Sequence, residues 1–194
     1  MQKFIKIETG IENLTVIKPN IFQDDRGFFF ESYNERDFLE IGINDEFVQD
    51  NHSKSQKGVL RGLHFQKENS QGKLIRVVKG KIYDVAVDLR QDSRTFGKYF
   101  GTELSEENKL MLYIPKNFAH GFLALEEGTE ILYKTTDYYN PADEYGIIWN
   151  DSDLNIDWKL EEYKIKKEDL ILSEKDKKQE TFKKYRRKKN EIFK

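Results

Sequence analysis

The side chains best suited to acid–base chemistry cluster in one stretch, Phe47–Gln66, which reads FVQDNHSKSQKGVLRGLHFQ. Hydrogen-bonding groups are interspersed there with apolar residues; they are Gln49, Asn51, His52, Ser53, Ser55, Arg61 and His64. Strand-like segments rarely carry so many polar groups, and buried polar groups need partners. These side chains therefore either satisfy one another or bind a polar ligand.

His64 is a candidate general base, because imidazole titrates near neutral pH; the alternative is a structural histidine. Arg61 favours a site, since a guanidinium suits phosphate or carboxylate. The two have opposite strand parity, so they face one pocket only if the strand bends or bulges at Gly62. Arg26 and Glu31, near a predicted turn, are either a surface pair or contacts to phosphate and sugar.

Further candidates lie elsewhere in the chain. On an inner face, Lys73 would need an anionic partner and could stabilise an oxyanion; otherwise it is the exposed start of a strand. Tyr133 and Tyr139 are a candidate proton donor and a candidate stacking platform, or aromatic core residues. Asp176 follows Ser173 by three residues, which is the spacing of a helix-capping carboxylate.

A metal site is the competing chemistry. The three histidines, His52, His64 and His120, are far apart, and Gln66 stands where a second histidine would complete a His-x-His pair. The chain has no cysteine, which excludes thiolate ligands and disulfides. We therefore expect no metal.

The elements that must position these residues are mostly strands. Short apolar or aromatic runs separated by turn residues predict strands at Leu14–Lys18, Gly27–Tyr33, Lys73–Val78, Ile82–Leu89, Tyr99–Leu104, Leu110–Ile114, Gly121–Leu125 and Glu130–Tyr139. Turns at Lys79–Lys81, Ser105–Asn108 and Glu127–Thr129 predict three hairpins among them. Asn34 is the expected N-cap of a short helix, Glu35–Ile41, which Gly42 ends. Short antiparallel strands with peripheral helices are typical of a β-sandwich or small barrel.

Alternation along the strands suggests which side chains share a face. It groups Lys73 with Ile75 and Val77, Phe118 with His120 and Phe122, and Ile131 with Tyr133, Thr135, Asp137 and Tyr139. If these faces point into a barrel, polar groups converge in an apolar interior. Such an interior is typical of a ligand pocket rather than a filled core.

Length and charge set the outer limits. The 194 residues suffice for one domain, and the net charge of −2 hides a basic end, because residues 175–194 hold ten Lys/Arg and three Asp/Glu. We interpret this end as a solvated, helical or frayed tail rather than a nucleic-acid site. No apolar run is long enough to span a membrane, and the N-terminus lacks the apolar core of a signal peptide, so a cytoplasmic protein is expected.

Several blocks, in this order, resemble one family, the dTDP-4-dehydrorhamnose 3,5-epimerases, which are cupin-type jelly rolls of dTDP-L-rhamnose biosynthesis. The blocks are Asp25–Glu31, Gln49–Gln66, Gln71–Leu74, Asp84–Arg90, Ile114–Pro115, Phe118–Phe122, Leu132–Thr136, Tyr138–Tyr139, Glu144 and Trp149–Asp151. The resemblance implies an all-β jelly-roll barrel or sandwich with a few short peripheral helices and a C-terminal helical segment. It implies a single epimerase domain over residues 1–180 and a basic tail over residues 181–194.

The resemblance also implies roles for individual residues. His64 matches the general base, Asp176 the acid that orients it, Tyr133 the proton donor, and Lys73 the group that stabilises the enolate oxygen. Substrate contacts are implied at Arg26, Glu31, Gln49, Asn51, Arg61, His120, Tyr139, Glu144 and Lys175, with Tyr139 stacking on thymine.

The implied protein is a cofactor-independent isomerase and a homodimer that exchanges strands. It would invert C3 and C5 of dTDP-4-keto-6-deoxy-D-glucose through an enolate and give dTDP-4-keto-L-rhamnose. Two alternatives stay open: an epimerase acting at one centre of a related nucleotide sugar, and a non-catalytic cupin that binds nucleotide sugars.

Overall fold

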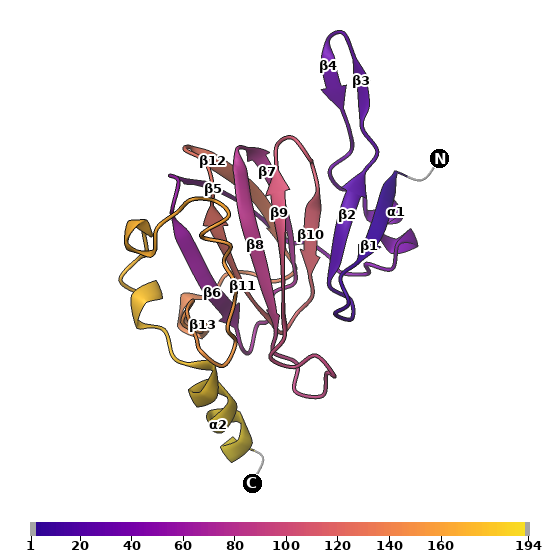
Figure 1. Ribbon diagram of the computed structural model, residues 1–194. Coiled ribbons are helices and arrows are strands. Elements are labelled where there is room, and N and C mark those ends of the chain that lie inside the picture. Colours follow the sequence, from indigo (N-terminus) through magenta and orange to yellow (C-terminus); the bar gives the residue numbers. More distant parts are fainter. Residues whose placement is uncertain (1–2, 193–194) are drawn as a thin grey trace.

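Two antiparallel sheets face each other in the computed structural model, which describes residues 3–192 (Figure 1). One sheet has the order β1-β2-β10-β7-β12-β5, and the other has the order β13-β6-β11-β8-β9. The strands are β1 (Phe4–Glu8), β2 (Thr15–Pro19), β3 (Phe22–Asp24), β4 (Gly27–Phe29), β5 (Gln49–Ser55), β6 (Leu60–Gln66), β7 (Lys73–Lys79), β8 (Lys81–Asp88), β9 (Tyr99–Ser105), β10 (Met111–Ile114), β11 (Phe118–Ala124), β12 (Thr129–Thr135) and β13 (Glu144–Gly146). This arrangement confirms the jelly-roll prediction.

Helices are short and peripheral. They are α1 (Glu35–Glu40), α2 (Phe182–Ile192) and the 3₁₀ turns η1 (Pro141–Asp143), η2 (Lys167–Asp169) and η3 (Asp176–Lys178). The predicted cap of α1 is confirmed, since the Asn34 side chain accepts hydrogen bonds from the backbone N–H groups of Arg36 and Asp37. Part of the basic tail thus forms α2, while residues 193–194 lie outside the described residues.

The three predicted hairpins are wrong. The short turns after β7, β9 and β11 each lead to a strand of the opposite sheet, because β7, β10 and β12 belong to the six-stranded sheet whereas β8, β9 and β11 belong to the five-stranded one. A tight turn looks the same in sequence whether its strands pair or change sheets. Strand β8 is buried continuously from Ile82 to Asp88, because its two faces pack against different layers.

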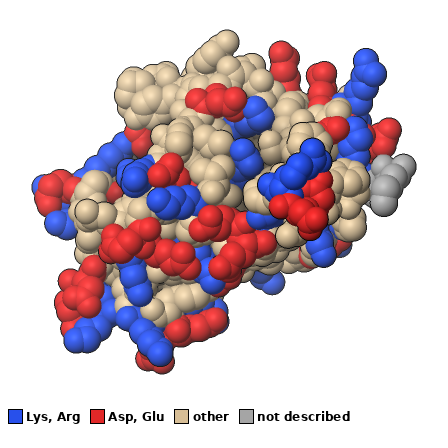
Figure 2. Space-filling view, turned by 90° about the horizontal axis from the view of Figure 1, so that it is seen from above, with Lys and Arg blue, Asp and Glu red and all other residues tan. Residues whose placement is uncertain are grey.

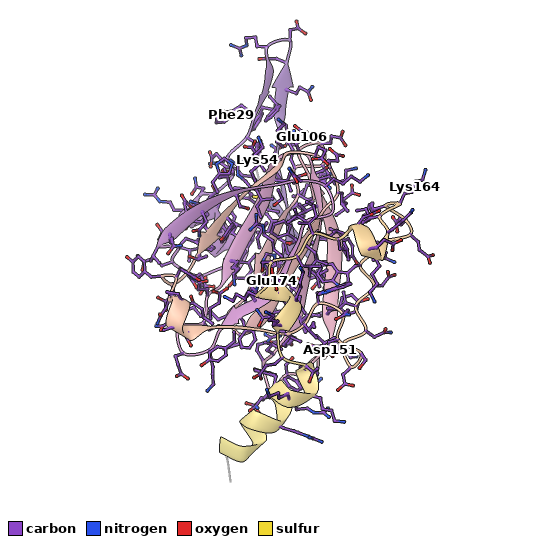
Figure 3. The ribbon with its side chains drawn as sticks, turned by 90° about the vertical axis from the view of Figure 1, so that its left-hand side faces the viewer. Phe29, Lys54, Glu106, Asp151, Lys164 and Glu174 are labelled. Carbon is purple, nitrogen blue, oxygen red and sulfur yellow. The ribbon has the colours of Figure 1, made fainter. Side chains whose placement is uncertain are left out.

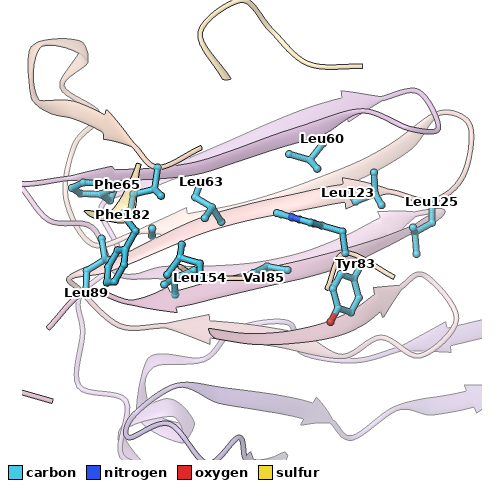
Figure 4. Close-up of a cluster of buried hydrophobic side chains, with 14 of the residues drawn as sticks. Leu60, Leu63, Phe65, Tyr83, Val85, Leu89, Leu123, Leu125, Leu154 and Phe182 are labelled. Carbon is cyan, nitrogen blue, oxygen red and sulfur yellow. The ribbon is translucent and has the colours of Figure 1, made fainter. Parts of the chain in front are cut away.

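Among the described residues 3–192, three apolar clusters hold the layers together. One lies between the sheets and includes Ile75, Phe122 and Ile131, so the predicted inner faces of β7, β11 and β12 are confirmed. A second lies between the outer face of the five-stranded sheet and the C-terminal segment, where Leu154 and Phe182 pack beside the strand residues (Figure 4). The third joins the six-stranded sheet to α1. Two of the three clusters therefore fix segments outside the barrel.

The β6–β11 pair carries the predicted irregularity at Gly62. Its register shifts there, because His120 lies opposite His64 but Phe122 lies opposite Arg61. Gly62 has φ +126, and a Cβ at this position would stand 2.5 Å from the Cα of Gly121. The bulge turns the side chains of Arg61 and His64 to the same side of the sheet, so both line the same pocket.

Two elements extend from opposite ends of the barrel. The β3–β4 hairpin projects beside the N-terminal strands, and α2 projects from the other end (Figure 1). On the face seen from above, side chains of both charge signs are interspersed rather than separated (Figure 2). Among residues 3–192, none of the helices is long and apolar enough to cross a membrane.

Candidate active site

A pocket of about 290 Å³ opens between the two sheets. Its walls come from both sheets and from the C-terminal segment that lies across this side of the barrel, where Glu174 is labelled (Figure 3). The lining residues are Ser53, Arg61, His64, Phe65, Gln66, Gln71, Lys73, His120, Phe122, Ile131, Tyr133, Tyr139, Glu144, Ser173 and Asp176. The four predicted catalytic residues are all among them, so the structure brings these side chains together.

His64 and Asp176 form a close pair. His64 Nε2 lies 2.5 Å from Asp176 Oδ1, and the Ser173 hydroxyl donates to Asp176 Oδ2 at 2.7 Å. Burial alone would raise the pKa of Asp176, but hydrogen bonds from His64, Ser173 and the Gly62 N–H hold that pKa below its ordinary value. Because an ionised carboxylate only accepts, His64 Nε2 carries the hydrogen and Nδ1 is left to accept a proton.

Lys73 and Tyr133 lie on the opposite wall. They belong to β7 and β12 of the six-stranded sheet, whereas His64 belongs to β6 of the other sheet. Burial lowers the pKa of Lys73 to about 8, opposed by the charges of Asp84 and Glu144. Burial also raises the pKa of Tyr133. At neutral pH the pocket thus offers a cation and a neutral phenol facing an imidazole.

His120 is held by a residue that the sequence reasoning missed. Asp84 is fully buried on β8, and its Oδ1 lies 2.6 Å from His120 Nε2. Asp84 Oδ2 has no hydrogen-bond partner among the described residues. An acidic residue inside the apolar run Ile82–Leu89 was the available signal, because a buried carboxylate needs compensating charge.

The mouth of the pocket is bridged by polar groups. The Tyr139 hydroxyl donates to Glu144 Oε2 at 2.5 Å, and Lys175 forms an ion pair with the same oxygen. The hydrogen bond to Glu144 raises the pKa of Tyr139 to about 12. Burial alone would raise the pKa of Glu144, but hydrogen bonds from Lys175 and Tyr139 keep it below its ordinary value.

Gln49 and Asn51 lie on β5 beside the pocket rather than in its wall. The Gln49 amide donates to Asn51 Oδ1 at 2.8 Å, and Asn51 lies opposite Tyr133 in the strand register. Arg61 does line the pocket, where its guanidinium donates to Ser55 Oγ at 3.3 Å.

Two predicted substrate contacts are not brought to this pocket within one chain. Arg26 lies in the turn of the β3–β4 hairpin and forms an ion pair with Asp24 at 2.6 Å. Glu31 follows the hairpin and pairs with Lys3 at 2.9 Å. Among residues 3–192, there is also no group of three His, Cys, Asp or Glu side chains placed to hold a metal ion.

The fold and this pocket define a cupin-type jelly roll with an acid–base site. The sequence model of the dTDP-4-dehydrorhamnose 3,5-epimerase family matches residues 8–184. A relative of that name from Salmonella typhimurium is 56% identical over 156 residues, covering 79% of this chain and 85% of the relative. The chain belongs to the dTDP-4-dehydrorhamnose 3,5-epimerase family.

Solved structures agree in fold. A dTDP-6-deoxy-D-glucose-3,5-epimerase from Legionella pneumophila, in complex with dTDP-4-keto-L-rhamnose, has a TM-score of 0.86 at 47% identity and 92% coverage of both chains. A 3′-monoepimerase from Streptomyces bikiniensis, in complex with dTDP-quinovose, has a TM-score of 0.84 at 28% identity, covering 92% of this chain and 88% of that chain. The same architecture thus occurs with one-centre and two-centre epimerases.

Proposed function

We propose that this protein is a dTDP-4-dehydrorhamnose 3,5-epimerase that inverts C3 and C5 of dTDP-4-keto-6-deoxy-D-glucose to give dTDP-4-keto-L-rhamnose. The observation that carries the proposal is the His64–Asp176 pair facing Lys73 and Tyr133 across one pocket. The relatives that share the family support the choice of substrate.

The chemistry accounts for these residue types. The protons on C3 and C5 flank the C4 carbonyl, so the removal of either proton gives an enolate. His64 Nδ1 takes the proton, and Asp176 stabilises the imidazolium that forms. The Lys73 ammonium meets the charge that develops on O4. Tyr133, on the opposite wall, returns a proton to the other face of the sugar and inverts the centre.

The remaining polar groups are proposed to bind the nucleotide. Cationic groups suit the diphosphate, and polar side chains along the mouth suit the sugar. This set comprises Gln49, Asn51, Arg61, His120, Glu144 and Lys175. Tyr139 is 52% exposed, and its ring suits stacking on the thymine base.

A homodimer would explain where Arg26 and Glu31 act. The hairpin that precedes Glu31 projects from the barrel and exposes Phe22, Phe28 and Phe29. A projecting apolar hairpin is suited to pairing with a second copy, where Arg26 and Glu31 would complete the partner's pocket. The proposal also includes strand exchange between the two copies and a cytoplasmic location. It takes residues 1–180 as one domain and residues 181–194 as a separate tail.

Deuterium exchange tests the reaction. Purified protein is incubated with dTDP-4-keto-6-deoxyglucose in D₂O, and NMR follows each sugar position. Exchange at both C3 and C5, lost in His64→Ala, is the expected result. If neither position exchanges while dTDP binds, the protein is a binding module and the proposal is overturned.

An epimerase acting at one centre is the second candidate. The similarity to a 3′-monoepimerase favours it as the alternative. Exchange at one position only would select it over the two-centre reaction.

A further inference from the structure

The segment Asp137–Asn140, which carries Tyr139, is irregular and links β12 to η1. Backbone polar groups in such a segment need partners outside a strand ladder. Each of its four residues finds one in a glutamine side chain. These glutamines come from three different places in the chain: Gln49 on β5, Gln66 at the end of β6, and Gln71 in the loop before β7.

Gln66 makes the central contacts. Its Nε2 donates to the carbonyl oxygens of Asn69 at 2.7 Å and Tyr138 at 3.2 Å, and its Oε1 accepts from the Asn140 N–H at 2.8 Å. Gln66 is 4% exposed, and its carboxamide uses both its donor and its acceptor end. A glutamate or a histidine could not satisfy this combination of two carbonyls and one N–H in the same way.

The other two glutamines hold the flanking groups. Gln71 Nε2 donates to the Asp137 carbonyl at 2.8 Å, and Gln49 Oε1 accepts from the Tyr139 N–H at 3.1 Å. Gln66 and Gln71 are buried, and both line the pocket. The backbone on both sides of the Tyr139 ring is thereby tied to the barrel wall.

We propose that Gln49, Gln66 and Gln71 are positioning residues that hold the Asp137–Asn140 backbone so that the Tyr139 ring stands at the pocket mouth as a stacking surface for the nucleobase. The inference rests on the proposed function, since it takes the ligand to be a nucleoside diphosphate sugar. A flexible segment would lose rotational freedom whenever a base stacked on Tyr139, whereas a fixed segment does not. Nucleotide affinity therefore depends on the three glutamine side chains that hold the backbone on either side of the stacking ring.

The test is a double-mutant cycle on dTDP binding, measured by calorimetry. Gln66→Met keeps the side-chain volume but removes all three hydrogen bonds, and we expect its dissociation constant for dTDP to rise roughly 5- to 20-fold. Tyr139→Ala removes the stacking ring itself. The double variant is expected to bind dTDP no more weakly than Tyr139→Ala alone, because Gln66 acts through Tyr139.

Controls separate positioning from general stability. Gln56→Met, at an exposed turn before β6, is expected to bind dTDP as the wild type does. In turnover, the Gln66→Met loss is expected in KM more than in kcat, which a loosened barrel would not produce. If Gln66→Met does not fold, Gln71→Met, which loses one hydrogen bond, enters the same cycle with an expected rise of roughly 2- to 5-fold.

Two results would overturn the inference: wild-type dTDP affinity in the folded glutamine variant, or losses that add to that of Tyr139→Ala. Deuterium exchange by the wild type is measured on the same preparation. Missing exchange with an intact binding cycle would overturn the proposed reaction alone, whereas normal exchange with additive losses would overturn the positioning role alone.

Discussion

His64 and His52 each lie beside a carboxylate, but the two pairs occupy different environments. His64 and Asp176 meet at 2.5 Å in the pocket, and Asp176 is buried and bonded on its second oxygen by Ser173. His52 meets Glu130 at 3.1 Å on the surface, and Glu130 is shared with Lys54. Water screens an exposed pair and lets its partners exchange, whereas burial fixes one geometry. Burial of the carboxylate, rather than its presence, therefore separates the candidate base from a surface histidine.

The largest effect is expected when the buried histidine is removed. His64→Ala should lower kcat for epimerisation by roughly 10²- to 10⁴-fold, because a positioned general base is lost. Steady-state kinetics coupled to a reductase for the product would measure it. Wild-type turnover in this variant would mean that another group takes the proton.

Removal of the carboxylate charge in the same pair should have the next largest effect. In Asp176→Asn, the side-chain amide can donate to the imidazole and thereby favours the wrong tautomer. The neutral amide also no longer stabilises the imidazolium. We expect kcat to fall roughly 10²-fold, with dTDP affinity measured by calorimetry close to wild type. A kcat within twofold of wild type would place Asp176 outside the reaction.

A smaller effect is expected when the buried residue Asp84 loses its charge. Asp84 opposes the burial that lowers the pKa of Lys73 to about 8, so Asp84→Asn should lower that pKa further. In the proposed reaction Lys73 acts as a cation, so the active form exists below its pKa and the alkaline limb of kcat should move to lower pH. For a decrease of one pKa unit, activity at pH 8 should fall roughly fivefold, and it should recover toward pH 6.

The pH–rate profile of the Asp84→Asn variant distinguishes this account from simple misfolding. An equal loss at every pH would contradict the electrostatic role of Asp84. Asn can still accept a hydrogen bond from His120, so the position of that imidazole is retained.

The smallest effect belongs to the surface pair. His52→Ala and Glu130→Gln should leave both kcat and the melting temperature unchanged within measurement error, because solvent replaces the lost contact. Calorimetric melting and the exchange assay would check both variants. A large loss of activity in either variant would show that exposure does not separate the two pairs.

Local signals allowed much of the fold to be predicted from sequence. The Asn34 cap, the strands and the inward faces of Lys73 and Tyr133 follow from alternation and capping rules that act within a few residues. Strand pairing could not be derived in this way, because the turn at Gly80 gives no sign that the next strand joins the other sheet. Glu130–Tyr139 was expected to be a strand throughout, but β12 ends at Thr135, where the glutamine-held segment begins.

The site was predictable to a similar extent. Ser173 and Asp176 have the spacing of a cap, and the Ser173 hydroxyl does accept the Asp176 N–H, yet the same carboxylate reaches His64. The predicted capping role is wrong, however, because η3 begins at Asp176 with Lys175 as its N-cap, whereas the contact with His64 is present. Asp84 was missed because its importance depends on Lys73 and His120, which approach it only in the folded barrel.

The separation of the His64–Asp176 pair along the chain has a consequence for biosynthesis. Asp176 follows His64 by 112 residues, so it leaves the ribosome long after the strand that carries the histidine. A nascent chain can already have formed most of its barrel while His64 Nε2 still lacks the carboxylate that pairs with it. Catalytic competence would then arise late in translation, and chains truncated before Asp176 would be released inactive even if their sheets had folded.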